Sequence, residues 1–120
     1  EHHFLSGDDN LSVVFFVYNV ALDAQRKPNI TVGYRFFEQA AVSEVFFSQT
    51  APVEFNSSTL PEQFDIQALN DQLFVSQAVA LQSFSEGAYR LEIVVTDNIA
   101  SRTIVKNVRF VVTPPHNRQP

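Results

Sequence analysis

The sequence predicts an all-β fold, an antiparallel sandwich of two sheets with about seven strands and at most one short helical turn. Three observations lead to this prediction. Several segments alternate apolar and polar residues with a period of two, β-branched and aromatic residues are abundant, and turn-forming residues recur at short intervals. Runs of strands without intervening helices favour antiparallel sheets that pack face to face.

Length and composition restrict the classes of protein. A chain of 120 residues that is 45% hydrophobic, with 12 Phe, has enough apolar material for one core. The formal net charge is −5 and no basic stripe occurs, so nucleic acid and anionic membrane surfaces are not expected partners. No run reaches the roughly 18 apolar residues of a membrane span. Because there is no Cys, disulfides and thiolate metal sites are excluded, and the absence of Met suggests a processed chain or a fragment.

The clearest strand is expected over residues 87–97. Gly87 permits the turn into this strand, and Asp97 begins the turn out of it. Apolar residues occupy every second position and therefore share one face: Tyr89, Leu91, Ile93 and Val95.

The first half of the chain offers three further strands. Residues 1–10 read as a polar N-terminal segment that ends in a turn. Residues 13–20 are an almost continuous apolar run, which is typical of a strand covered on both faces. Residues 30–37 alternate in polarity, and residues 42–47 are predicted to be their hairpin partner.

The segment after this hairpin contains an edge element and a turn. Pro52 confines residues 53–55 to an edge strand or an extended loop. Thr59 and Glu62 have the spacing of a capping box, which predicts a single helical turn there.

Two strands close the domain. Residues 73–81 carry apolar side chains of one parity, with Gln77 as the exception. Residues 104–112 form the last strand, in which Lys106 falls on the inward face, so we expect a bulge or an exposed strand end near it. The sandwich is thus expected over residues 11–113, followed by a Pro-rich tail or linker at 114–120.

A family resemblance joins these elements. Its residues are Leu81, Phe84, Gly87, Tyr89, Leu91, Ile93, Val95 and Asp97. Their spacing resembles the penultimate strand of bacterial immunoglobulin-like and fibronectin-type β-sandwich domains. The resemblance implies an immunoglobulin-like sandwich in which Tyr89 is the tyrosine corner and Leu91 replaces the second Cys. The family's core Trp is absent, so an aromatic such as Tyr34 or Phe36 would fill that space.

More narrowly, residues 11–112 are similar to the C-terminal β-domain of secreted acidobacterial proteins that carry von Willebrand A-type or GWxTD regions. The matching stretches are residues 16–19, 31–36 and 89–97. This resemblance implies an extracellular or periplasmic location. It implies no reaction, because such domains have no activity assigned to them.

Residues that carry chemistry are sparse. All three histidines lie near the termini, at positions 2, 3 and 116, and neither a Cys nor a Gly-x-Ser-x-Gly motif is present. We therefore expect no enzyme and no cofactor. Asp8, Asp9 and Asn10, joined by Asp97 from another turn, are a weak candidate for Ca²⁺, against the alternative of a solvated polar turn.

Three Asn residues begin glycosylation acceptor sequences: Asn10, Asn29 and Asn56. Such sites would lie in surface loops of a secreted protein. In a bacterial chain chance is the better account of the three sequences, and an archaeal source would reverse that preference.

Adjacent phenylalanines are the remaining functional signal. Neighbouring residues of a strand face opposite sides, so one Phe of each adjacent pair cannot enter the same core. We predict that Phe16, Phe37 and Phe47 lie outside as a protein interface, with coverage by loops as the alternative. An exposed sheet edge would add pairing with a strand donated by residues 1–12 or 113–120 of another chain.

The expected function is therefore a structural or protein-interaction module that meets neighbouring domains or identical subunits. The alternatives are a self-assembling filament subunit and, less favoured because Trp is absent, a carbohydrate-binding module.

Overall fold

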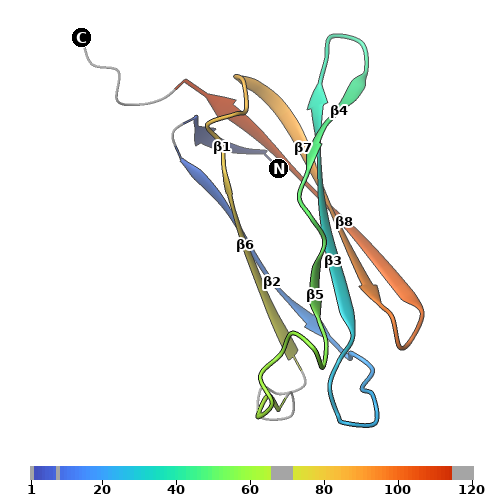
Figure 1. The fold of residues 1–120 in the computed structure, drawn as a ribbon. Coiled ribbons are helices and arrows are strands. Elements are labelled where there is room, and N and C mark those ends of the chain that lie inside the picture. Colours follow the sequence, from blue (N-terminus) through green and yellow to red (C-terminus); the bar gives the residue numbers. More distant parts are fainter. Residues whose placement is uncertain (1, 8, 66–71, 115–120) are drawn as a thin grey trace.

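The computed structural model describes residues 2–7, 9–65 and 72–114 (Figure 1). All regular structure in these ranges is β, and no helix that could cross a membrane occurs in them. The strands are β1 (His2–Ser6), β2 (Asn10–Tyr18), β3 (Ile30–Gln39), β4 (Glu44–Gln49), β5 (Val53–Phe55), β6 (Gln72–Ala80), β7 (Gly87–Asp97) and β8 (Arg102–Thr113).

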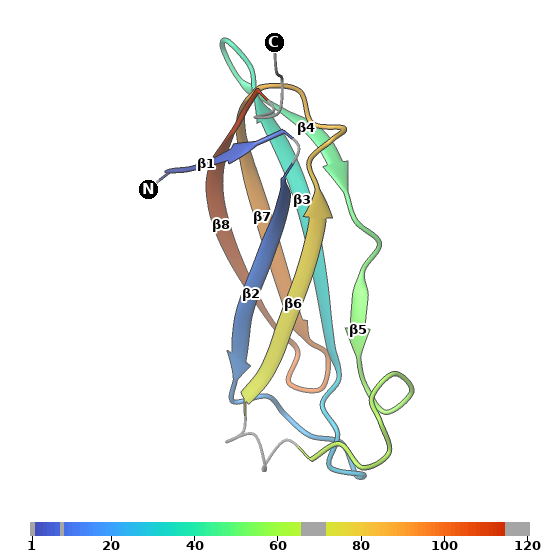
Figure 2. The ribbon, with the colours of Figure 1, turned by 90° about the vertical axis from the view of Figure 1, so that its left-hand side faces the viewer.

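The strands form two layers, which confirms the prediction of an all-β protein with two sheets. The large sheet has the order β1-β8-β7-β3-β4, with β5 also paired to β3, and the small sheet consists of β2 and β6 (Figures 1 and 2). Every pair is antiparallel except β1 with β8, which run parallel.

The parallel strand β1 corrects two predictions, the uniformly antiparallel pairing and the polar N-terminal segment. Residues His2 to Ser6 pair with Arg109 to Thr113 of β8. Leu5 packs against the core, and its carbonyl accepts a hydrogen bond from the Thr113 hydroxyl at 3.1 Å. The predicted turn follows directly, since the Asp9 amide donates to the Ser6 carbonyl and the Asp9 carboxylate accepts from the Ser6 amide.

Strand β7 is the centre of the molecule. It pairs over its whole length with β8 on one side and, over nine residue pairs, with β3 on the other. Its odd-numbered residues from Tyr89 to Asp97 are all buried, as the period of two predicts. The buried apolar residues of both sheets are Val13, Ile30, Val32, Tyr34, Phe36, Leu73, Val75, Leu81, Phe84, Tyr89, Leu91, Ile93, Val95, Phe110 and Val112.

Aromatic rings fill one end of this core. The ring of Phe84, from the segment between β6 and β7, lies 5.2 Å from that of Phe36 and 5.1 Å from that of Tyr89. Tyr89 also stacks on Phe110 at 5.5 Å. Its hydroxyl donates to the Ser85 carbonyl at 2.7 Å, which closes the turn before β7. Burial raises the pKa of the Tyr89 hydroxyl.

Strand β2 is covered on one face only, so the prediction of two covered faces is wrong. Val13 is buried and Leu11, Phe15 and Val17 pack against the core, whereas the even-numbered residues are exposed. The strand lies in a two-stranded layer with no third layer outside it among the described residues (Figure 2). An apolar run therefore does not by itself identify a doubly buried strand.

A β-bulge decides the orientation of the aromatic residues in β4. Phe36 pairs with Ser48, but Phe37 pairs with Phe46, so Phe47 is an extra residue in β4. The bulge turns Phe47 inward, where its ring lies 4.8 Å from that of Phe84. Phe46 consequently points outward and is 53% exposed.

The turn after β5 lies earlier in the chain than the helical turn that was predicted to begin at Thr59, and no helix is formed in residues 59–65. The Leu60 amide donates to the Asn56 carbonyl at 2.9 Å, which makes a single helical-type turn. Its free amides are capped by the Asn56 side chain, which accepts from the Ser58 amide at 2.8 Å. Thr59 is therefore not the N-cap, and it instead donates its hydroxyl hydrogen to the Glu54 carbonyl.

Candidate interaction surface

The outer face of the small sheet carries four large apolar side chains. Val14, Phe16 and Tyr18 project from β2 and Phe74 projects from β6, and each is between 47% and 60% exposed. Phe16 and Phe74 occupy opposite positions in the strand pair, with ring centroids 5.4 Å apart. Tyr18 extends the row, 6.4 Å from Phe16. We call these four residues the aromatic patch.

The aromatic patch has no charged neighbour within its own sheet. Neither β2 nor β6 contains an Asp, Glu, Lys or Arg, and the other outward residues near the patch are Ser12, Ser76 and Gln72. With about half of each side chain exposed, the patch presents roughly 400 Å² of apolar surface. A single apolar surface of this size is comparable to the largest one on a typical monomer, which is often a binding site.

The three phenylalanines predicted for an interface have different outcomes. Phe16 lies in the aromatic patch. Phe37 is on the outer face of the large sheet, but it is half-buried because the Arg90 guanidinium lies over its ring at 4.3 Å. The prediction for Phe47 is wrong, since the bulge places its ring in the core and leaves Phe46 outside.

Sequence reasoning missed Val14, Tyr18 and Phe74. The parity of β2 carried the signal: from Val13 to Tyr18 both the odd and the even residues are apolar, so one of the two sets had to face away from a single core. In β6 the parity was assigned correctly, and Phe74 is the large apolar residue that falls on the polar side.

The edges of the two sheets are protected differently. In the large sheet, β4 begins with Glu44 and carries the bulge, Pro52 precedes β5, and β8 is partly covered by β1. Charges, bulges and Pro discourage pairing with other chains. The two strands of the small sheet have neither charge nor Pro, and neither has a second partner among residues 2–7, 9–65 and 72–114.

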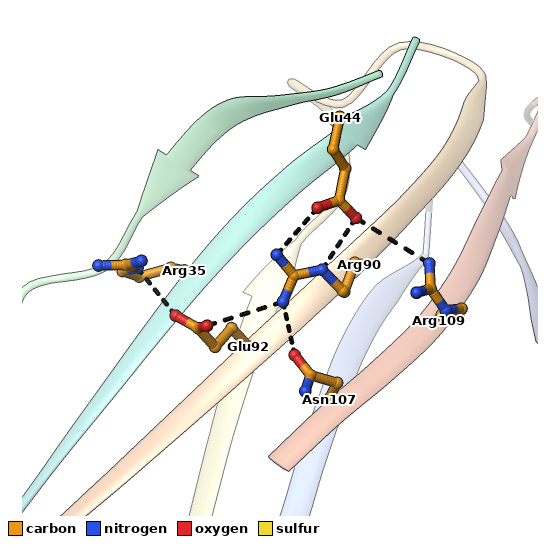
Figure 3. A network of polar contacts seen from close by, with 6 residues as sticks. All are labelled: Arg35, Glu44, Arg90, Glu92, Asn107 and Arg109. Carbon is orange, nitrogen blue, oxygen red and sulfur yellow. Dashed lines mark hydrogen bonds and ion pairs between the residues drawn. The ribbon is translucent and has the colours of Figure 1, made fainter. Parts of the chain in front are cut away.

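A polar network crosses the outer face of the large sheet (Figure 3). Arg90 of β7 donates to both Glu44 oxygens at 2.8 and 2.9 Å and to Asn107 Oδ1 at 2.6 Å. Arg109 approaches Glu44 to 4.0 Å. The hydrogen bonds from Arg90 hold the pKa of Glu44 below its usual value, and the same bonds raise the pKa of Arg90.

This network has a structural consequence. Glu44 belongs to the edge strand β4 and Arg90 to the central strand β7, so their paired contact spans β3 and holds the edge strand in place. The neighbouring pair, Arg35 of β3 with Glu92 of β7 at 3.0 Å, joins directly opposite residues of two adjacent strands. Because the charges are mutually paired, we do not assign the network a ligand.

The residues predicted for Ca²⁺ do not come together. Asp97 lies beyond the end of β2, where its Oδ2 accepts from the Ala21 amide at 3.0 Å, and its Oδ1 accepts from the Ile99 and Ala100 amides. Asp9 precedes the start of β2, roughly 26 Å away at the rise of an extended strand. Asp8 lies outside the described residues. A site that joins Asp97 to Asp9 and Asn10 is therefore not formed.

The predicted acceptor residues are only partly in loops. Asn10 is the first residue of β2, whereas Asn29 and Asn56 precede β3 and follow β5. The Asn29 side chain accepts a hydrogen bond from Asn98 at 3.0 Å. The Asn56 amide group donates to Glu54 at 3.2 Å, so its nitrogen takes part in the turn.

One buried polar atom has no hydrogen-bond partner in the described part of the chain, the hydroxyl of Tyr34. Tyr34 is 1% exposed, and burial raises the pKa of its hydroxyl. The hydroxyl lies within the core and not in a site that brings ionisable groups together. Among the described residues, no three His, Asp or Glu side chains have the arrangement of a metal site. The side chains of His2 and His3, and all of His116, lie outside the description.

Comparison with known proteins adds no identification: the chain matches no protein-family model and shows no significant match among curated proteins.

Proposed function

We propose that this chain is a non-catalytic protein-interaction module with an immunoglobulin-like sandwich, and that it meets its partner through the aromatic patch. The observation that carries the proposal is that Phe16, Tyr18 and Phe74 lie exposed and adjacent on an uncharged sheet face. A sheet face turned to water ordinarily carries polar residues, and aromatic residues are enriched in protein interfaces.

The size of the aromatic patch indicates what kind of contact it makes. Covering roughly 400 Å² of apolar surface is worth about 10 kcal/mol before costs, while association itself costs on the order of 4–15 kcal/mol. A stable interface buries about 800 Å² on each partner. The patch is thus the size of an interface centre, and the partner must also contact the surrounding surface.

The strand order supports the immunoglobulin-like part of the proposal. In that fold, strands C, F and G share one sheet, and strands B and E are neighbours in the other. Here β3, β7 and β8 share one sheet while β2 and β6 form the other. The hydrogen bond from Tyr89 to the carbonyl four residues upstream has the form of a tyrosine corner, and Leu91 is buried two residues later.

Two features depart from that family. Strands that would flank β2 and β6 have no counterpart in the described residues. The core Trp is absent, and Tyr34 of β3 is, with Tyr89, one of the two largest fully buried side chains in the described residues. We also propose an extracellular or periplasmic location, because the sequence resembles exported bacterial domains. The partners of this chain would then be neighbouring domains or another exported protein.

A photo-crosslinking amino acid placed on the patch tests the proposal in the native host. Positions 16 and 74 should yield the same crosslinked protein. Position 105, an exposed apolar position on the large sheet, is the matched control and should yield none. Equal products from position 105, or no product from positions 16 and 74, would refute the proposal.

Self-assembly is the second candidate, favoured by the uncharged free edges of β2 and β6. Strand donation by residues 1–12 would require displacement of β1 and of the start of β2, since residues 2–6 and 10–12 already pair within their own chain. Sedimentation of the purified chain over a wide concentration range tests self-assembly. If the chain is a monomer at the highest concentration, the filament hypothesis is refuted.

A glycan array addresses the third alternative. Binding that depends on Tyr18 would identify a carbohydrate-binding module and replace the proposed protein partner.

A further inference from the structure

A glycine lies in the middle of β3 without a structural reason. Gly33 pairs in regular register with Val94, so it marks no bulge, and it is not among the residues with positive φ. A Cβ atom at Gly33 would meet no atom within 4 Å beyond those of its two sequence neighbours. Glycine weakens a strand interior, and a strand glycine often marks a place where a ligand or another chain approaches closely.

A hollow of about 240 Å³ lies over this glycine, on the outer face of the large sheet. It forms where the edge of the sheet is interrupted, because β5 pairs with β3 only as far as Val32 and β4 pairs with β3 only from Arg35 (Figure 1). Between the two edge strands, the Thr50 amide donates to the Tyr34 carbonyl at 3.1 Å. We call this space the Gly33 hollow, and its lining includes Gly33, Arg35, Gln49, Thr50, Pro52 and Val94.

The Gly33 hollow has apolar walls and a cation beside them. Val94 and Pro52 are apolar, and Gly33 offers only its backbone. The Arg35 side chain is 49% exposed, and its Nε lies 3.0 Å from Glu92, which holds the guanidinium group in place (Figure 3). The outward neighbours of Gly33 on β3 and β7 include no aromatic residue that could cover it.

We propose that the Gly33 hollow receives one aromatic side chain of a partner protein. Its volume is below the roughly 300–1,000 Å³ of pockets that enclose a whole small-molecule ligand, so it fits a single side chain. A flat ring can lie directly on the backbone of a strand glycine, as aromatic residues do when they cover a glycine of the same sheet.

Charge complementarity selects the ring. The Arg35 guanidinium would face the π electrons of an aromatic side chain, and an aliphatic side chain offers no such contact. Gln49 and Thr50 add hydrogen-bonding groups that suit the hydroxyl of a tyrosine.

This site is independent of the proposed function, because the Gly33 hollow and the aromatic patch lie on the outer faces of different sheets. A chain with both sites contacts two partners at once, one on each face. Val105 pairs with Val94, roughly 10 Å and two strands away from Gly33, and it does not line the hollow. Crosslinks from position 105 therefore do not report on the hollow.

Two small probes test the inference on the ¹⁵N-labelled full chain, N-acetyl-tyrosine amide and N-acetyl-leucine amide. The tyrosine probe should shift the amide signals of Gly33, Thr50 and Val94, with a Kd of roughly 1–10 mM for so small a ligand. The leucine probe should bind about two- to fivefold more weakly, because it has no π electrons to face Arg35. The signals of Phe16 and Phe74 report unspecific contact with apolar surface in the same spectra.

Three variants sharpen the test. Gly33→Val fills the hollow and should weaken binding of the tyrosine probe at least about tenfold, while the midpoint of thermal unfolding rises because Val favours strands and its Cβ has room. Loss of binding together with a gain in stability does not arise from misfolding. Thr103→Val is the matched control, since Thr103 is exposed on the same outer face and pairs with Thr96, outside the hollow. It should leave binding unchanged. Arg35→Gln should remove the preference for the tyrosine probe.

Several results would overturn the aromatic site: equal affinity of the two probes, unchanged binding to Gly33→Val, or equally large shifts at Phe16 and Phe74. The absence of any shift at the highest soluble concentration of the tyrosine probe would overturn it as well. None of these results affects the crosslinks from positions 16 and 74. The Gly33 hollow and the proposed function therefore stand or fail separately.

Discussion

The bulge in β4 makes a prediction about two adjacent residues. Phe46 and Phe47 are chemically identical, but only Phe47 packs in the core. Replacing each in turn by Ala therefore measures how much each ring contributes to the free energy of unfolding. We expect Phe47→Ala to destabilise the protein more than Phe46→Ala.

The magnitudes follow from the contacts. Removing a fully buried Phe side chain costs about 3–5 kcal/mol. Phe47 is only partly buried, but its ring lies 4.8 Å from that of Phe84 and 5.4 Å from that of Tyr89, so we expect a loss of about 2–3 kcal/mol. Phe46 is 53% exposed and its ring contacts that of Phe37 at 5.8 Å, so its loss should be about 0.5–1 kcal/mol.

Urea unfolding measures both variants under the same conditions. With a slope of about 1–1.5 kcal/mol per molar urea, a difference of about 1.5 kcal/mol separates the two midpoints by roughly 1 M. Equal slopes verify that the comparison concerns stability and not a change in the denatured state. A loss for Phe46→Ala that equals or exceeds the loss for Phe47→Ala would show that β4 pairs with β3 without the bulge, and would refute the reasoning.

Three further predictions concern single positions. Gly87 has φ of 147°, so Gly87→Ala should cost about 1–3 kcal/mol, whereas Gly33→Ala in the open outer face of β3 should stabilise slightly; thermal unfolding of both variants checks this. Tyr34→Phe removes a buried hydroxyl and should raise the free energy of unfolding by about 1 kcal/mol. Burial raises the pKa of Tyr34, so above about pH 10 only the unfolded chain releases this proton and the wild type should lose stability. This loss of stability at high pH should be smaller in the variant. Arg90 lowers the pKa of Glu44, so the stability that ionised Glu44 contributes is present above its unfolded pKa of 4.5 and is lost as the pH falls through the lower folded pKa. Glu44→Gln should therefore flatten the decline of the unfolding free energy with falling pH, measured by urea unfolding at successive pH values. An unchanged decline would contradict the role of the Glu44–Arg90 pair.

Much of the fold was predictable from local patterns. In β7 and β3 one parity is apolar and the other mixed, so their buried faces were assigned correctly. Pro52 placed β5 at an edge because Pro cannot donate a ladder hydrogen bond. The hairpin of β3 with β4 also formed as predicted, but its bulge did not follow from local sequence, because Phe46 and Phe47 have equal propensity for either face.

The candidate surface was predictable only in part. Phe16 was placed outside, while Val14 and Tyr18 were assigned to a covered face because residues 13–18 of β2 are all apolar. The calcium hypothesis joined Asp97 to Asp9 without knowing that β2 separates them. In both cases the missing information was the position of one element relative to another.

The sequence by itself determined where the strands after β1 run and which of their residues share a face, because side-chain alternation and turn chemistry act between near neighbours in the chain. Only the tertiary structure decided which faces and edges are covered: that β1 pairs with the end of β8, that Phe47 packs against the core, and that the outer face of β2 remains open. Burial depends on what packs opposite a face, and that is set by contacts between residues distant in sequence.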